Sequence, residues 1–251
     1  MKNLKICFVL LSALTLLYCK NEKNDTAIVS KEENIKIIPI QHGTLILETK
    51  TDVIYVDPTG GLDAFKNQKK PTLVLITDIH GDHLSIKTLE AIDLTHAMVI
   101  APKAVADKIP STIVESPKVL SNGAVVEING VKIEAIPMYN LREEALKYHT
   151  KGRGNGYVLD IAGERIYISG DTEDIPEMRR LKNIDKAFVC MNLPYTMTVE
   201  SAADAVLEFK PREVFPYHYR GTEGMSDVNL FKEIVKKGDD SIAVTLLNWY
   251  K

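Results

Sequence analysis

The chain has 251 residues, of which 45% are hydrophobic, and a net charge of −3 from 31 lysines and arginines against 34 acids. This length and composition suit one domain of about 200 residues with a sizeable core. The near-neutral charge gives no electrostatic footprint for nucleic acid, and three cysteines without paired spacing support neither a disulfide framework nor a cysteine zinc knuckle.

The first 34 residues carry the signals of export. A short basic segment precedes Ile6–Tyr18, an apolar run too short to span a bilayer comfortably as a helix, and Cys19 follows at once. This resembles a bacterial lipoprotein signal, so we expect residues 1–19 to be a signal peptide with Cys19 as the lipidated residue. Tyr18 stands where such signals prefer a small residue, which leaves an ordinary cleaved signal peptide or an uncleaved anchor as alternatives.

The polar residues 20–34 predict a flexible tether. The expected protein is therefore exported and held in a membrane by a lipid anchor, on the periplasmic or cell-surface side. A folded domain is expected over residues 35–251.

Strand signals dominate the first part of this domain. A hairpin signal at residues 49–52 separates two apolar runs, and Asp57–Gly61 is a turn. Ser85 is placed to cap a helix. In chain order we expect strands at residues 35–40, 44–48, 53–56 and 73–76, a helix at 86–92, a strand at 98–101 and a helix at 104–108.

The second part repeats this order, first rich in strands and then alternating strands with helices. Asn129-Gly130 is a strong hairpin signal, Ala162–Glu164 separates another pair of strands, and Thr198 is a helix cap. Because hairpins and crossovers are mixed, an α/β sandwich of two sheets with helices outside fits better than one parallel sheet. The expected strands are 125–128, 131–136, 156–161, 165–169, 186–190, 213–217 and 243–247, and the helices are 199–209 and about 227–237.

Residues of the types that bind metals follow three of these strands. Four of them lie on one loop, Thr77-Asp78-Ile79-His80-Gly81-Asp82-His83, while Asp171 and His218 each follow another strand. Side chains from several strand ends can converge on one point, and hydrolytic metal sites use imidazole nitrogen and carboxylate oxygen. The alternatives are a solvated polar loop, a helix cap at Asp171 and a hydrogen-bonded, half-buried histidine at His218.

Together these motifs resemble the metallo-β-lactamase fold hydrolases, over roughly residues 35–250. The signature of that family is H-x-H-x-D-H, then a single histidine, an aspartate in a G-D-T turn and a last histidine. Gln41-His42-Gly43-Thr44, Val56-Asp57-Pro58 and Ser169-Gly170-Asp171-Thr172 are similar to the ascorbate-6-phosphate lactonase-like branch of metal-dependent hydrolases. The resemblance implies a four-layer αβ/βα sandwich of two mixed β-sheets with helices outside.

The resemblance also implies a first metal ion bound by Asp82, His83 and His218, with Asp171 bridging to a second ion. Asp82 is the expected catalytic residue, because it could orient the attacking water as well as bind the metal. A metal ion lowers the pKa of its bound water from about 16 toward about 7, which yields a nucleophile at neutral pH.

The second ion is expected at Asp78 and His80, with Asp171 and Asn140. Asp78 stands in place of the first histidine of the signature, and Asn140 in place of the single later one, for which His149 is a second candidate. Carboxylate and amide oxygens are harder ligands than imidazole. We therefore expect one or two divalent ions, zinc first, with manganese or iron as alternatives.

Several other side chains are candidates for lining the substrate site. These are His42, Asn140, His149 and Tyr195. Asp57 is expected to support the metal-binding loop from its turn. The basic, glycine-rich segment Lys151–Gly156 lacks the spacing of a phosphate-binding loop but is a candidate for holding an anionic substrate.

The predicted function is a metal-dependent hydrolase that directs a metal-activated water onto a carbonyl, as in a lactone or amide, or onto a phosphoester of a small molecule. The alternative is an exported metal-binding lipoprotein whose degenerate fold does not hydrolyse, which the substitutions at Asp78 and Asn140 favour modestly. A redox role is a further alternative, because relatives of this fold hold two irons.

Overall fold

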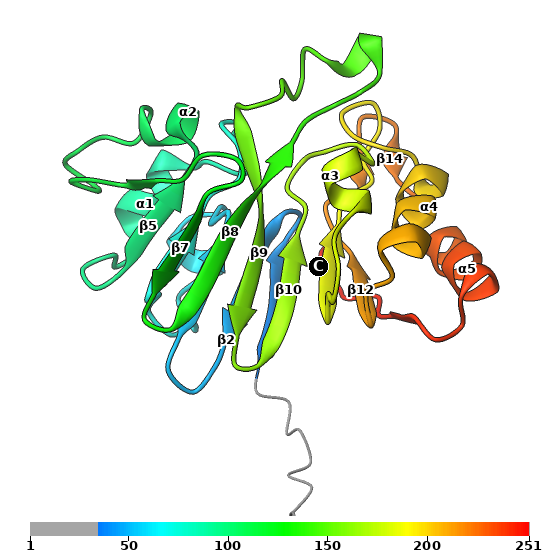
Figure 1. The fold of residues 1–251 in the computed structure, drawn as a ribbon. Coiled ribbons are helices and arrows are strands. Elements are labelled where there is room, and N and C mark those ends of the chain that lie inside the picture. Colours follow the sequence, from blue (N-terminus) through cyan, green and yellow to red (C-terminus); the bar gives the residue numbers. More distant parts are fainter. Residues whose placement is uncertain (1–34, 251) are drawn as a thin grey trace, which may run out of the picture. The chain divides into compact units, whose positions relative to one another are not determined.

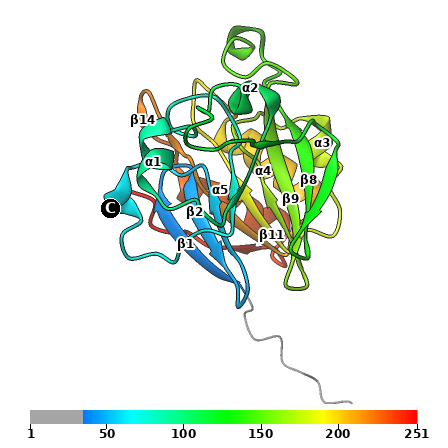
Figure 2. The same ribbon diagram turned by 90° about the vertical axis from the view of Figure 1, so that its left-hand side faces the viewer.

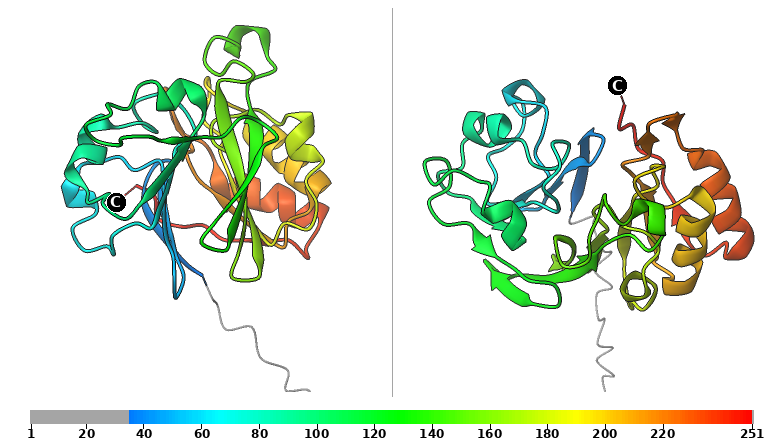
Figure 3. Two further views of the ribbon diagram at one scale, coloured as in Figure 1. Left: turned by 60° about the vertical axis from the view of Figure 1, so that its left-hand side comes forward. Right: turned by 90° about the horizontal axis from the view of Figure 1, so that it is seen from above.

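The computed structural model describes residues 35–250. The predicted signal peptide, the lipidation of Cys19 and the tether at residues 20–34 lie outside the described residues. Two β-sheets form the centre, with α1 and α2 on the side of the first sheet and α3, α4 and α5 on the side of the second (Figure 1). Turned views show the same arrangement (Figure 2; Figure 3), which confirms the predicted four-layer sandwich.

The first sheet contains the first six strands in chain order. The pairs β1–β2 and β2–β3 are antiparallel, whereas the three pairs from β3 to β6 are parallel. Its elements, including the two outer helices and a 3₁₀ turn, are β1 (Lys36–Gln41), β2 (Thr44–Glu48), β3 (Val53–Val56), η1 (Leu62–Ala64), β4 (Leu73–Leu75), α1 (Ile86–Ala91), β5 (Met98–Ala101), α2 (Lys103–Ala106) and β6 (Lys118–Val119).

The second sheet has seven strands in the order β15-β12-β11-β10-β9-β8-β7 and repeats the change from antiparallel to parallel pairing. Its strands are β7 (Val125–Ile128), β8 (Val131–Met138), β9 (Gly154–Ile161), β10 (Glu164–Ile168), β11 (Lys186–Val189), β12 (Glu213–Pro216) and β15 (Ala243–Val244). The elements around it are η2 (Glu143–Ala145), α3 (Pro176–Arg179), α4 (Val199–Phe209), the small hairpin β13 (Arg220–Gly221) and β14 (Gly224–Met225), and α5 (Val228–Gly238).

Alternation of side chains along the central strands divides the core between two spaces. On β2, Leu45 and Leu47 belong to the large cluster between the sheets, while Ile46 belongs to the cluster beneath α1 and α2. Because successive side chains on a strand point to opposite faces, a strand covered on both sides becomes apolar throughout. This explains the continuous apolar runs in the sequence.

The expected helix caps are confirmed, while some short elements differ from expectation. The side chains of Ser85 and Thr198 each accept a hydrogen bond from the backbone N–H three residues later in the chain, as N-caps do. The strand expected at 243–247 ends at Val244, because the chain then leaves the sheet toward Trp249, whose indole N–H donates to Pro216. The pieces α3, β6 and the β13–β14 hairpin were not expected, since two to four residues show no periodicity.

No helix over residues 35–250 is both long and apolar enough to cross a membrane. The connection between β8 and β9, which includes η2, projects past the ends of the strands (Figure 1).

Candidate metal centre

The candidate ligands gather at one end of the two sheets, in the loops that follow the carboxyl ends of parallel strands. The Thr77–His83 loop follows β4, Asp171 follows β10, and His218 follows β12. His149 comes instead from the projecting connection between β8 and β9, and His42 from the turn between β1 and β2. Loops at strand ends carry function because a rigid sheet positions them.

His83 is oriented by a buried carboxylate. Its Nδ1 lies 2.7 Å from Asp57 Oδ2, and the same carboxylate accepts from the backbone N–H and the hydroxyl of Thr77 at 2.7 and 2.6 Å. Because the ionised carboxylate of Asp57 can only accept, the neutral His83 ring carries its proton on Nδ1, which leaves the Nε2 lone pair for a metal ion. Asp57 thus holds the metal-binding loop through Thr77, as expected, and it also orients the His83 ring directly.

Asp171 lies at the centre of three imidazoles. Its Oδ2 is 3.3 Å from the Nε2 atoms of both His83 and His149, and its Oδ1 is 3.4 Å from His218 Nδ1. Burial alone would raise the pKa of Asp171, yet His218 and His83 hold it well below its usual range. The same contacts act on His83, where burial is outweighed by Asp171 and Asp57 and the pKa is raised.

Several polar atoms in this group have no hydrogen-bond partner among the described residues although they are buried. They are His83 Nε2, His149 Nε2, both ring nitrogens of His218 and Asp171 Oδ1. Buried polar groups are normally paired, so such a cluster requires an explanation. Imidazole and carboxylate atoms that converge without partners fit a divalent cation, which supplies the missing interaction. His83, Asp171 and His218 form one group whose ligand atoms lie within 4.8 Å of one another.

A second group of this kind consists of Asp78, His80 and His149. His149 Nδ1 donates to the carbonyl oxygen of Tyr195 at 3.1 Å, so its Nε2 lone pair also points inward. The sequence interpretation also placed Asn140 here, and that placement stays a prediction. The amide N–H₂ group of Asn140 donates to the carbonyl oxygens of Ala145 and Tyr195, while its buried Oδ1 has no hydrogen-bond partner among the described residues.

Asp78 is also the partner of a cation. The guanidinium of Arg153 donates to both oxygens of Asp78, at 3.2 and 3.1 Å, and also to the carbonyl of Tyr148. The Asp78 side chain is fully buried, which would raise its pKa, but the hydrogen bond from His80 and the charges of His83 and Arg153 lower that pKa. The basic glycine-rich segment therefore binds an internal carboxylate at Arg153, while Lys151 pairs with Glu177 on the surface.

Asp82 differs from the other carboxylates because 45% of its side chain is exposed. Its Oδ2 lies 3.3 Å from His218 Nε2 and 3.4 Å from His42 Nε2, which makes a third group with these two histidines. Burial would raise the pKa of Asp82, but the adjacent imidazoles of His218 and His42 hold it well below its usual range.

His42 and His218 are tightly packed against each other. Their rings stack at 3.7 Å between centroids, and both residues adopt a left-handed backbone with φ of 48° and 47°. Such conformations in residues other than glycine are uncommon and concentrate at functional sites. Gly43 permits this approach, since a Cβ there would lie 2.7 Å from the His218 ring.

Asp82 lines two cavities. One of about 600 Å³ is lined by His42, Asp82, Arg220 and Tyr250 among others. The other, of about 300 Å³, is lined by His80, Asp82, Tyr148, His149, Asp171, Asn192 and Tyr195. Of the residues expected to line a substrate site, His42, His149 and Tyr195 therefore border a cavity beside the ligands.

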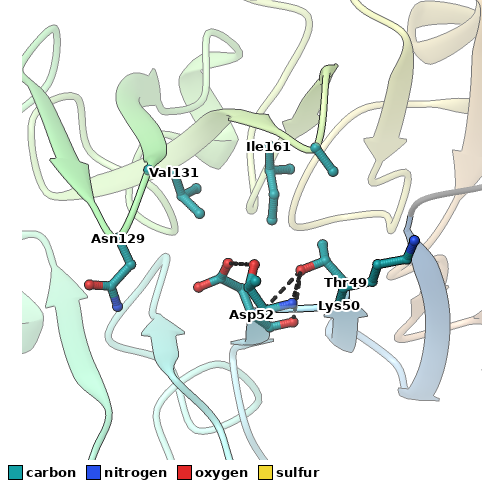
Figure 4. Close-up of a pocket in the computed structure, with 9 residues that line it drawn as sticks. Thr49, Lys50, Asp52, Asn129, Val131 and Ile161 are labelled. Carbon is teal, nitrogen blue, oxygen red and sulfur yellow. Dashed lines mark hydrogen bonds between the residues drawn. The ribbon is translucent and has the colours of Figure 1, made fainter.

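Another cavity, of about 320 Å³, lies among three hairpin turns (Figure 4). It is bordered by Thr49–Asp52, Asn129 and Ile161, at the start of β3 and the opposite end of that strand from Asp57. It contains none of the candidate ligands.

The sequence interpretation missed two residues of the site. Arg153 carried a visible signal, since its segment is basic and rich in glycine, but its partner was not foreseeable. Tyr250 carried none, because its hydroxyl reaches His42 across 208 positions in the chain.

Comparisons with known proteins agree with this geometry. A family model described as "Beta-lactamase superfamily domain" matches residues 36–218, a range that includes every candidate ligand. The chain is 32% identical to a UPF0173 metal-dependent hydrolase of Thermococcus onnurineus, over 69% of this chain and 78% of that protein. It is 29% identical to a UPF0173 metal-dependent hydrolase of Pyrococcus abyssi, over 84% of this chain and 96% of that protein.

A solved structure is similar as well. It is the crystal structure of a protein from Parabacteroides distasonis described as a metal-dependent hydrolase, which is 39% identical to this chain. The match covers 86% of this chain and 94% of the other, with a TM-score of 0.76.

Proposed function

Since the chain belongs to the beta-lactamase superfamily and, within it, to the UPF0173 metal-dependent hydrolase family, we propose that it is a metal-dependent hydrolase of a small molecule. The observation that carries this proposal is the set of unpartnered nitrogens around Asp171. His83, His149 and His218 each aim a ring nitrogen at this carboxylate from 3.3 to 3.4 Å.

His83, Asp171 and His218 would hold one divalent ion, and Asp78, His80 and His149 a second, with Asp171 between them. When bound, such ions supply Lewis acidity and an activated water at neutral pH. Each set contains two imidazoles and one carboxylate, which suits zinc and also iron. We propose zinc, and metal analysis distinguishes it from iron and manganese.

Asp82 would orient the attacking water. Its depressed pKa keeps the carboxylate ionised, so its oxygens accept hydrogen bonds, and its position at both cavities gives access to water and to substrate. The substrate we propose is a carbonyl or phosphoryl ester, with a lactone suggested by the motifs around His42, Asp57 and Asp171. Its leaving group would occupy one cavity and the remainder the other.

The test is a hydrolysis assay of the protein loaded with zinc, manganese or iron against a γ-lactone, an aryl ester and an aryl phosphodiester. We expect turnover of at least one substrate class. His218→Ala should abolish that turnover, while His96→Ala, a change at an exposed histidine that belongs to none of the ligand groups, should leave it intact.

A second candidate function is favoured by one observation, the bidentate pairing of Arg153 with Asp78. A cation that already neutralises this carboxylate weakens the second metal group and suits a protein that binds metal without hydrolysis. Full metal occupancy of the first group together with no turnover of any of the three substrates would support this alternative.

We also propose that the protein is exported and anchored through lipid on Cys19. The support is the basic segment followed by the apolar run Ile6–Tyr18 directly before that cysteine. Radiolabelled palmitate should be incorporated into the expressed chain and lost in Cys19→Ser. Cleavage without incorporation would instead indicate an ordinary signal peptide.

A further inference from the structure

The rings of His42 and His83 both stack on His218, yet the hydrogen bonds at their Nδ1 atoms run in opposite directions. His83 Nδ1 faces the carboxylate of Asp57 at 2.7 Å and must donate. His42 Nδ1 faces the hydroxyl of Tyr250, also at 2.7 Å. Which nitrogen carries the proton decides which ring can bind a cation, so the role of the Tyr250 hydroxyl determines the role of His42.

The three neighbours of the Tyr250 hydroxyl allow one arrangement of hydrogen bonds. The backbone N–H groups of Tyr219 and Arg220 both donate to it, each at 3.1 Å. A phenolic oxygen has two acceptor positions and one proton, and both acceptor positions are then used. The hydroxyl proton must therefore go to His42 Nδ1, and a neutral imidazole that accepts at Nδ1 carries its own proton on Nε2.

The His42 Nε2 atom lies beside Asp82, at one of the two cavities of the site. It lies 3.4 Å from Asp82 Oδ2 and borders the 600 Å³ cavity. We propose that His42 is not a metal ligand, although it lies in a potential ligand group with Asp82 and His218. It is instead a fixed N–H donor to an oxygen of the substrate bound beside Asp82, an assignment that rests on the proposed hydrolase function. A preorganised donor of this kind stabilises negative charge that develops during acyl or phosphoryl transfer.

The surrounding backbone keeps the His42 ring in place. The His42 N–H donates to the carbonyl of Trp249 at 3.4 Å, and its own carbonyl accepts from the His218 N–H at 3.2 Å. The ring stacks on His218 on one side. Trp249 and Tyr250, the last residues that the structure describes, thus serve as a positioning element for His42, and Tyr250 is its positioning residue.

The experiment is nuclear magnetic resonance of the full-length protein with ¹⁵N-labelled histidine, first without metal and then loaded with ¹¹³Cd²⁺. The six histidines are assigned from single substitutions. Without metal, we expect His42 as the Nε2–H tautomer with a nonprotonated Nδ1. With cadmium, we expect ¹¹³Cd–¹⁵N coupling at His83 and His218 and none at His42.

Two variants separate positioning from general damage. Tyr250→Phe should shift both His42 ring resonances toward those of a mixture of tautomers, while Tyr219→Phe should leave them unchanged, because only the backbone of Tyr219 takes part. His42→Asn, which tolerates the left-handed backbone, should keep the metal content of the unmodified protein. His218→Asn should lose metal.

Coupling of cadmium to His42, or an Nδ1–H tautomer, would overturn the assignment. Failure of the protein to bind any metal would instead refute the proposed hydrolase. The His42 tautomer in the metal-free protein would still test the hydrogen-bond argument in that case.

Discussion

At the scale of single residues, the polarity of one hydrogen bond sets what each histidine can do. Asp57 and the Tyr195 carbonyl can only accept, so they expose the Nε2 lone pairs of His83 and His149. Residues that orient metal ligands in this way often matter nearly as much as the ligands themselves.

Replacement of Asp57 by asparagine should therefore weaken metal binding. An amide has one acceptor oxygen for the three donors that now share the two oxygens of Asp57. Its NH₂ group would donate to His83 Nδ1 and so favour the tautomer with the proton on Nε2, the nitrogen that should bind the metal. We expect zinc affinity to fall about 10- to 100-fold, measured by competition with a chromophoric chelator. Asp63→Asn, a change at a largely exposed aspartate, is the control, and equal affinity in both variants would contradict the account.

Removal of the Arg153 charge should strengthen, not weaken, binding of the second metal ion. Its guanidinium neutralises the buried Asp78, so a cation must compete with it for the same oxygens. In Arg153→Gln we expect the weaker of two zinc-binding steps to tighten about tenfold, a change of about 1.4 kcal/mol. Lys151→Gln removes a charge from the same loop without touching Asp78, and titration calorimetry should show no such gain there.

At the scale of elements, the sequence predicted the strands and longer helices well because apolar alternation and capping are local signals. For the loop between β8 and β9, the sequence left two candidate ligands open. Asn140 and His149 both lie on it, and the choice between them depends on a path that crosses to Tyr195, 46 residues beyond His149. Local patterns cannot supply such long-range contacts, nor those of Arg153 with Asp78 and Tyr250 with His42.

The turn between β1 and β2 shows how an element shapes the site. Gly43→Ala would place a methyl group 2.7 Å from the His218 ring, whereas a Cβ at Gly81, on the metal-binding loop, meets nothing within 4 Å. We expect Gly43→Ala to lower metal affinity by at least tenfold with a near-native circular dichroism spectrum. Gly81→Ala should bind as the unmodified protein does, and a tolerant Gly43→Ala would show that the stacked histidines are not packed as described.

At the scale of the whole molecule, the site joins the two sheets. Asp57 and His83 come from the first sheet, and Asp171 and His218 from the second, so a bound ion would link the halves of the sandwich. A ligand that binds only the folded state stabilises it by an amount that grows with the logarithm of the ligand's excess over Kd, about 4 kcal/mol at a thousandfold excess. Zinc at a thousandfold excess should raise Tm by about 10 °C for a chain of this size.

The difference in Tm between zinc-loaded and metal-free protein should become larger as pH rises from about 6 to 8. The pKa of His83 is raised in the fold, so in metal-free protein its stabilising contribution is complete below about pH 6.5 and declines as pH rises toward the folded pKa. Metal binding requires neutral imidazole, so it strengthens over the same range. Thermal melts with zinc and with chelator across this range provide the check, and a constant difference would argue against His83 as a ligand.

The most direct test of the central claim is the number of metal ions per chain, measured by inductively coupled plasma mass spectrometry on protein purified without chelator. We predict one to two ions per chain in the unmodified protein, with loss of at least one in His83→Ala and in His218→Ala. His96→Ala, at an exposed histidine, should retain the full number. Absence of metal under every loading condition, or full retention in both ligand variants, would contradict a metal centre built around Asp171.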